Sequence, residues 1–288
     1  MTWLPLSLAC ALFVAISDAL AKEALKSGNE YVVSLIRVAG GCVFITPLIF
    51  FRGWATPTAG FWTALLILLP LDCVSMLLYN RALKLSPLSL TVPFLAFTPV
   101  FLLLTSWAIL GEAPTHQGLS GVVLVSLGGY LLNAPEARRG LLAPVRAVLR
   151  EPGSRLMVAV AAVYSVSSSV GKVAVLASDP FLMPAIYFPA LFAVLVPLVA
   201  KKSSGFPRAP VFKRILLVTA LGLFEALGSL TNFLAVQETH VTYMISVKRL
   251  SLLFAVLFGW LFFKEKNAGA RLLGGSVMVL GVMLIAFR

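Results

Sequence analysis

The segment Ser246–Glu265 reads SVKRLSLLFAVLFGWLFFKE, and it is apolar almost without interruption from Leu250 to Phe263. Similar runs recur along the whole chain of 288 residues, of which 60% are hydrophobic and only 12% are charged; the mean hydropathy is +0.98. A soluble domain of this size cannot bury so much apolar side chain. The composition therefore predicts an all-α membrane protein with many transmembrane helices.

Ten apolar stretches are long enough to cross a bilayer. Most of the 23 Lys and Arg residues lie in alternate gaps between these stretches, and the gap side rich in Lys and Arg is expected to be cytoplasmic. Both chain termini are then predicted on the outer side. The stretches fall at about 3–22, 31–51, 61–83, 88–110, 115–133, 155–177, 180–200, 211–236, 241–263 and 267–287.

Several function classes are disfavoured by the residues present. The net charge of +12 comes from cations in short gaps between apolar runs, which is typical of a membrane protein rather than of a nucleic-acid binder. Three cysteines lie in apolar segments without CxxC spacing, and the two histidines fall in outer loops without an HExxH motif. We expect no enzyme, no metal site and no cofactor, and a GxxxxGK[ST] loop for ATP is absent from the sequence.

The two halves of the chain resemble each other. At an offset of 153 residues, Trp107 corresponds to Trp260, Glu112 to Glu265, and acidic Asp72 to Glu225. Near the start of each half the offset is 150, as for Lys22 and Lys172; in the later part of each half, Gly121 and Gly128 correspond to Gly274 and Gly281. Because each half has an odd number of spans, the sequence predicts two inverted five-helix repeats, at 1–133 and 155–288, joined by a cytoplasmic linker at 134–154.

With these features, the chain resembles the EamA-type members of the drug/metabolite transporter superfamily. The resemblance covers essentially the whole chain and is most specific where an apolar span ends in an acid and a Gly-rich span follows. Those stretches read FLLLTSWAILGEAPTHQGLSGVVLVSLGGYLL and FAVLFGWLFFKEKNAGARLLGGSVMVLGVMLI. The resemblance implies a secondary transporter of the bacterial inner membrane that moves small metabolites by alternating access, often outward, and it leaves the substrate open.

Ionisable side chains within the predicted spans are the first candidates for a substrate site, because placing them there costs about 2.5–3.5 kcal/mol each. Asp18 and Arg37 fall at similar depth on adjacent spans, which favours a structural ion pair. The repeat mates Asp72 and Glu225 fall near the midplane. They are either proton-coupling carboxyls or packing acids bonded to a neighbouring Ser or Asn.

Lys248 and Arg249 allow two interpretations. In the first, one cation pairs with Glu225 and the other attracts a substrate carboxylate in the cavity, while a midplane acid binds an amine or a proton. In the second, one cation reaches the outer headgroups and the other forms a salt bridge. Their repeat mates are Leu95 and Ala96, so the fold does not require cations here, which favours the functional interpretation.

Other residues complete the predicted site and its scaffold. Glu112 and Glu265 are expected to cap the helices that follow them, and the glycines at seven-residue spacing are expected to allow close helix packing, including a dimer contact. Prolines in the second, third, fourth and seventh spans predict bent helices around a cavity. The aromatic residues proposed to line a central pocket are Tyr79, Phe101, Tyr164 and Tyr187.

The sequence therefore predicts a transporter that exports amino acids from a cavity between the two repeats. Buried charge of both signs suits a zwitterion better than a lipophilic cation. An exporter of drugs or amphipathic cations is the alternative, and a scaffold without transport is disfavoured. The expected partners are a small-molecule substrate, a coupling proton and the lipid bilayer, with no nucleic acid, and the chain is expected to act as a monomer or homodimer.

Overall fold

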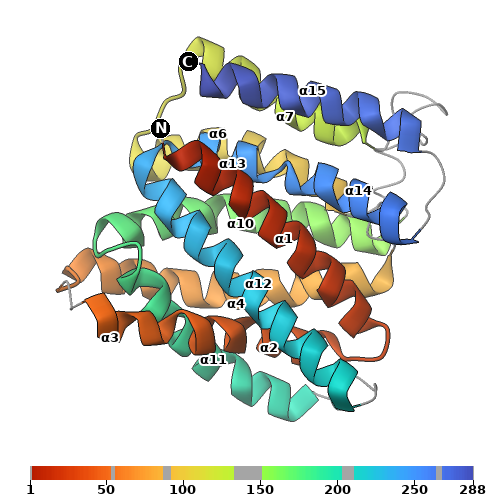
Figure 1. The fold of residues 1–288 in the computed structure, drawn as a ribbon. Coiled ribbons are helices and arrows are strands. Elements are labelled where there is room, and N and C mark those ends of the chain that lie inside the picture. The colour runs from red at the N-terminus through yellow and green to blue at the C-terminus, as the bar shows by residue number, and fades with distance from the viewer. Residues whose placement is uncertain are drawn as a thin grey trace.

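The computed structural model describes residues 2–52, 56–86, 92–132, 151–202, 211–263 and 268–287, which form helices without a strand among them (Figure 1). The helices are α1 (Trp3–Leu25), α2 (Glu30–Phe44), the 3₁₀ helix η1 (Thr46–Leu48), α3 (Ile49–Arg52), α4 (Ala59–Leu85), the 3₁₀ helix η2 (Val92–Phe97), α6 (Thr98–Leu110), α7 (His116–Leu131), α10 (Pro152–Leu176), α11 (Leu182–Lys202), α12 (Val211–Glu238), α13 (Val241–Lys248), α14 (Ser251–Phe263) and α15 (Ala268–Ala286).

The predicted all-helical membrane class is confirmed. Within the described residues, each of the ten predicted spans holds one helix or a short series of helices. Six of these helices are both long and apolar enough to cross a bilayer. Residues 134–150 of the predicted linker lie outside the described part of the chain, and its last residues already belong to the first turn of α10.

Three of the predicted spans are interrupted rather than continuous. The second span breaks at η1, next to Pro47, and the fourth passes from the 3₁₀ helix η2 to α6 just before Pro99. The ninth span breaks between α13 and α14 at Arg249 and Leu250, without a proline. By contrast, α4 and α11 continue through Pro70 and Pro189 without an interruption of the helix.

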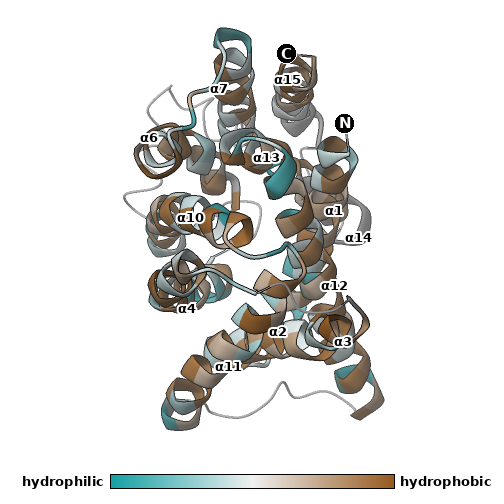
Figure 2. Cartoon of the chain, turned by 90° about the vertical axis from the view of Figure 1, so that its left-hand side faces the viewer, coloured by the Kyte–Doolittle hydropathy of each residue, from teal (hydrophilic) through white to brown (hydrophobic). Residues whose placement is uncertain are grey.

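Packing joins helices that are distant in the sequence. α1 packs against α12, and α4 packs against α10, and these two pairs form the centre of the molecule (Figure 1). At one edge α7 lies along α15, and at the opposite edge α2 lies along α11 (Figure 2). Two large hydrophobic clusters fill the space between these helices.

The four glycines at seven-residue spacing bring α7 and α15 into backbone contact, as the sequence predicted. A Cβ placed on Gly121 would lie 2.6 Å from the carbonyl oxygen of Gly281, and one on Gly128 would lie 2.6 Å from that of Gly274. These distances leave no room for any side chain. These four glycines therefore allow two helices of the same chain to pack closely, namely the fifth and tenth spans.

The outer surface of the helices is apolar. Phe50, Leu66 and Leu104 are each at least 70% exposed. Such a surface suits hydrocarbon and not water. The three cysteines, Cys10, Cys42 and Cys73, are free thiols.

Candidate functional site

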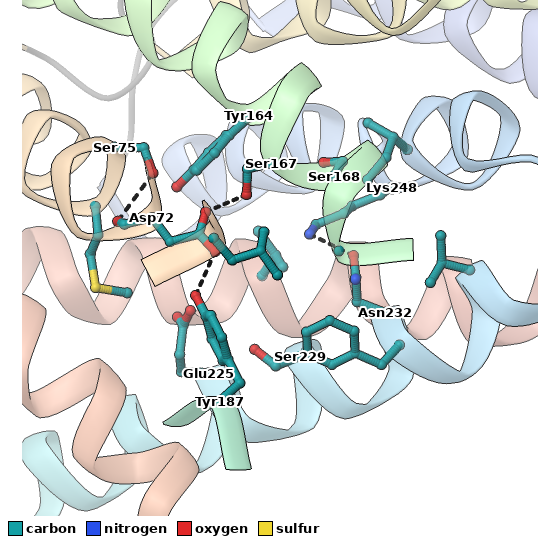
Figure 3. A pocket seen from close by; sticks show the side chains of 18 of the residues that line it. Asp72, Ser75, Tyr164, Ser167, Ser168, Tyr187, Glu225, Ser229, Asn232 and Lys248 are labelled. Atoms are coloured by element: carbon teal, nitrogen blue, oxygen red, sulfur yellow. Dashed lines mark hydrogen bonds between the residues drawn. The ribbon is translucent and has the colours of Figure 1, made fainter. Parts of the chain in front are cut away.

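A cavity of about 200 Å³ is lined by residues of α1, α2, α4, η2, α10, α11, α12, α13 and α14 (Figure 3). Seven of the eight residues predicted for the substrate site line it: Asp72, Tyr79, Tyr164, Tyr187, Glu225, Lys248 and Arg249. Phe101 is absent from its lining and packs, partly buried, against the hydrophobic core. Phe101 belongs to α6, which contacts α10 and contributes no residue to the cavity lining.

Asp72 on α4 is held by hydroxyl groups rather than by a cation. The Tyr187 hydroxyl donates to Asp72 Oδ2 at 2.7 Å, and the Ser167 hydroxyl donates to Asp72 Oδ1 (Figure 3). Within the described residues, no Lys or Arg forms an ion pair with Asp72. Its carboxyl group is thus oriented by α10 and α11 and remains available to a ligand that carries a positive charge.

Arg37 on α2 forms ion pairs with the other two acids of the cavity wall, Asp18 and Glu225. Its Nη2 atom lies 2.5 Å from Asp18 Oδ1, and its Nε atom lies 3.3 Å from Glu225 Oε2. Tyr79 donates to the second oxygen of Asp18 at 2.6 Å, and Ser17 donates to Glu225 at 2.7 Å. The predicted pairing of Asp18 with Arg37 is confirmed, and the cluster extends to α4 and α12.

The prediction that Lys248 or Arg249 pairs with Glu225 is wrong. Glu225 pairs with Arg37 because α12 packs against both α1 and α2, which brings it to the guanidinium. Lys248 instead donates to the side-chain oxygen of Asn232 at 2.9 Å, two turns further along α12 (Figure 3).

Arg249 is a buried cation, with 4% of its surface exposed, at the break between α13 and α14. Its Nη2 atom donates to the Thr98 hydroxyl at 2.8 Å, and its Nε atom has no hydrogen-bond partner. No carboxylate of the described residues pairs with it. A buried arginine without a counter-charge is unfavourable, so its place in the cavity wall favours a site for a ligand that supplies negative charge.

Charged residues of both signs line the cavity. Asp18, Asp72 and Glu225 contribute three negative charges, and Arg37, Lys172, Lys248 and Arg249 contribute four positive charges; Lys172 pairs with Glu112, which lies outside the lining. The chemistry of this wall suits a small solute with both a positive and a negative group. Among the described residues, no cluster of His, Cys, Asp and Glu suits a metal ion.

Sequence reasoning missed the small polar residues between the charges. Ser229 and Asn232 follow Glu225 at four and seven residues, so they share one face of α12, and all three line the cavity. Ser167 and Ser168 on α10 line it as well. A search for polar residues at i, i+4 and i+7 around each midplane acid finds the face of α12 from the sequence alone.

Glu112 does not cap the helix that follows it, so that prediction is wrong. Thr115 is the N-cap of α7, and its hydroxyl accepts from the Gly118 amide at 3.1 Å. Glu112 lies after the turn at Gly111, whose φ of 67° directs the chain away from α6. There it accepts from the Val241 amide at 2.9 Å and forms an ion pair with Lys172. Glu265 lies outside the described residues.

Known proteins support the family suggested by this architecture. A protein of Archaeoglobus fulgidus named as an uncharacterized transporter is 22% identical over 284 residues, which cover 97% of this chain and 96% of that protein. A solved structure titled only as the crystal structure of a protein has the same fold, with a TM-score of 0.74 at 17% identity, covering 97% of this chain and 96% of the other. The family described as the EamA-like transporter family matches residues 1–134 and 152–287. Since these ranges include nearly the whole chain, the protein belongs to the EamA-like transporter family of membrane transporters.

Proposed function

We propose that the protein is a secondary transporter that binds small zwitterions in the central cavity, amino acids being the substrate class, and exports them by alternating access. One observation carries the proposal: Asp72 has no cationic partner among the described residues, and Lys248 and Arg249 have no carboxylate partner. An amino acid supplies both missing charges at once, with its ammonium group at Asp72 and its carboxylate at the two cations.

The arrangement of the polar groups supports this orientation. In Figure 3, Asp72 lies to the left and Lys248 to the right, with Ser167 between them and Tyr187 below Asp72. Arg249 and Lys248 are consecutive residues at the end of α13, where the chain breaks before α14. Broken helices near the midplane are a recurring feature of substrate sites in secondary transporters.

The size and charge of the cavity favour a small metabolite over a drug. Pockets for drug-sized ligands have roughly 300–1,000 Å³, whereas this cavity has about 200 Å³. A wall with three acids and four bases gives a lipophilic cation no net attraction. Export of amphipathic cations therefore remains the second candidate, favoured only by the tyrosines of the wall.

The proposed inverted repeat supports alternating access. Under the 150- and 153-residue correspondence, α1 exchanges with α10 and α12 exchanges with α4, so the contact of α1 with α12 becomes the contact of α10 with α4. That exchange is the behaviour expected of two inverted repeats. The Lys and Arg distribution supports termini on the outer face of a bacterial inner membrane.

Efflux from proteoliposomes tests the proposal. Vesicles are loaded with a mixture of amino acids and amphipathic cations, and loss of each solute is followed by mass spectrometry with and without a proton gradient. Selective loss of amino acids supports the proposal and names the substrate. Selective loss of cations overturns it in favour of the second candidate, and loss of neither under both conditions overturns both.

A further inference from the structure

Lys172 joins three segments at one end of the cavity. It lies near the end of α10 and lines the cavity, and its amino group donates to the Thr239 carbonyl, just after α12, at 2.6 Å. The same amino group forms an ion pair with Glu112, from the connection between α6 and α7. Both partners are shielded: the Lys172 side chain is 8% exposed and that of Glu112 is 13% exposed.

Glu112 in turn holds the start of α13. Its second carboxylate oxygen accepts from the amide of Val241, the first residue of that helix. An acid at a helix N-terminus is stabilised by the free amides and by the helix dipole. Through these contacts, Lys172 and Glu112 tie α10 and α6 to the end of α12 and the start of α13, and we call these two residues the latch.

The latch lies at the chain-terminus end of the molecule. The Thr2 hydroxyl donates to Glu238 beside Thr239, which places the start of α1 next to the end of α12. Lys172 and Val241 belong to the cavity wall, whereas Glu112 and Thr239 lie outside the lining. The ion pair therefore joins the cavity wall, through Lys172, to a residue outside the wall, Glu112.

The corresponding lysine of the first half makes the corresponding contact at the opposite end. Lys22, near the end of α1, donates to the Ser86 carbonyl at 2.8 Å, just after α4. Lys22 and Lys172 differ by 150 residues, and Ser86 and Thr239 differ by 153, the two offsets of the repeat. A lysine that binds the carbonyl end of a neighbouring helix is thus common to both ends and serves as a C-terminal cap.

We propose that the ion pair between Lys172 and Glu112 is the gate that closes the cavity at the chain-terminus end, and that it must open in each transport cycle. The inference rests on the proposed function, since a gate has meaning only in a transporter. Buried ion pairs are strongly destabilised when one partner is removed. Loss of either charge is therefore expected to shift the protein toward states that are open at this end.

Labelling of a cavity cysteine from each face of the membrane tests the gate. Ser229→Cys places a reporter in the cavity wall, and the parent protein with its three native cysteines gives the background. A membrane-impermeant maleimide is added to one face of sealed vesicles at a time. Lys172→Met and Glu112→Gln are expected to raise the labelling rate from the face nearest the latch by at least about tenfold, with no rise from the other face.

Two matched variants serve as controls. Lys22→Met removes the corresponding lysine and is expected to leave labelling from the latch face unchanged, and Lys172→Arg keeps the cation and is expected to label at the parental rate. Glu112→Gln retains an oxygen for the Val241 amide, so it decides the outcome should Lys172→Met fail to fold. Unchanged labelling in Glu112→Gln, or an equal rise from both faces, overturns the gate.

The labelling requires no solute, so its outcome is independent of the efflux experiment. Selective labelling without amino-acid efflux retains the gate and rejects the substrate. Amino-acid efflux with unchanged labelling rejects the gate and retains the proposed function.

Discussion

Arg37 lies between two carboxylates from different helices, 2.5 Å from Asp18 and 3.3 Å from Glu225, and its side chain is only 5% exposed. This guanidinium links α2 to α1 and α12. Because it is the only cation that forms an ion pair with these two acids among the described residues, its removal leaves both acids without a counter-charge.

Replacement of Arg37 by Met is expected to lower the free energy of unfolding by about 3–5 kcal/mol, because two buried acids lose their partner. Lys84→Met is the matched control: it also breaks an ion pair, with Glu30, but the Lys84 side chain is 42% exposed and the loss should be about 0–1 kcal/mol. Unfolding in mixed micelles measures both values. Equal losses in the two variants would contradict the structural function of the cluster.

Asp72→Asn is expected to reduce amino-acid transport by roughly tenfold to a hundredfold while the protein stays folded, because a hydrogen bond to a charged group contributes about 1.5–3 kcal/mol. The amide keeps the shape of the side chain and an oxygen for the Tyr187 hydroxyl. Initial rates in proteoliposomes measure the effect. Tyr187→Phe only loosens the orientation of Asp72, so it should reduce the transport rate less than Asp72→Asn does. A larger reduction in Tyr187→Phe than in Asp72→Asn would argue against Asp72 as the ammonium site.

Lys248 and Arg249 are expected to recognise the substrate carboxylate. The wild type should therefore discriminate between a free amino acid and its amide, and Lys248→Gln should lose much of that discrimination. The comparison is a double-mutant cycle, in which the protein and the ligand each lose one charge. A coupling free energy near zero for Lys248→Gln and for Arg249→Gln would place the carboxylate elsewhere.

The glycine contacts between α7 and α15 predict a steric requirement. A Cβ on Gly128 would lie 2.6 Å from the backbone of Gly274, so Gly128→Val is expected to destabilise the protein by about 1–3 kcal/mol or more. Gly171→Ala is the matched control, since no atom lies within 4 Å of its added Cβ, and it should be neutral or slightly stabilising. Thermal unfolding by tryptophan fluorescence distinguishes the two, and a stable Gly128→Val would refute the close contact.

The membrane class, the positions of the spans and the charges of the cavity could be predicted from the sequence because they depend on composition and on distance along one helix. An apolar run must reach about 20 residues to cross a bilayer, and a charge within it is conspicuous. The glycine contact could also be predicted, since repeated small residues have few other uses in membrane helices.

The partner of each charge could not be predicted, because depth in the membrane does not specify which way a helix faces. Glu225 and Lys248 lie at similar predicted depths. Because α12 packs on α2, however, Glu225 forms an ion pair with Arg37, and Lys248 forms a hydrogen bond with Asn232. Phe101 illustrates the same limit: it is in the expected span, but its side chain faces the core. The helix break at Arg249 is not marked by a proline in the sequence, so only the three-dimensional structure reveals it.

The pairing of α7 with α15 has a further consequence for how such a protein diversifies. This pair contributes no residue to the cavity wall, which is built by residues of α1, α2, α4, η2, α10, α11, α12, α13 and α14 and by Arg249. The helices that pack through glycines are therefore separate from the helices that line the cavity. A selection for transport of a new solute should collect substitutions on α4, α10 and α12, and it should leave the glycines of α7 and α15 untouched.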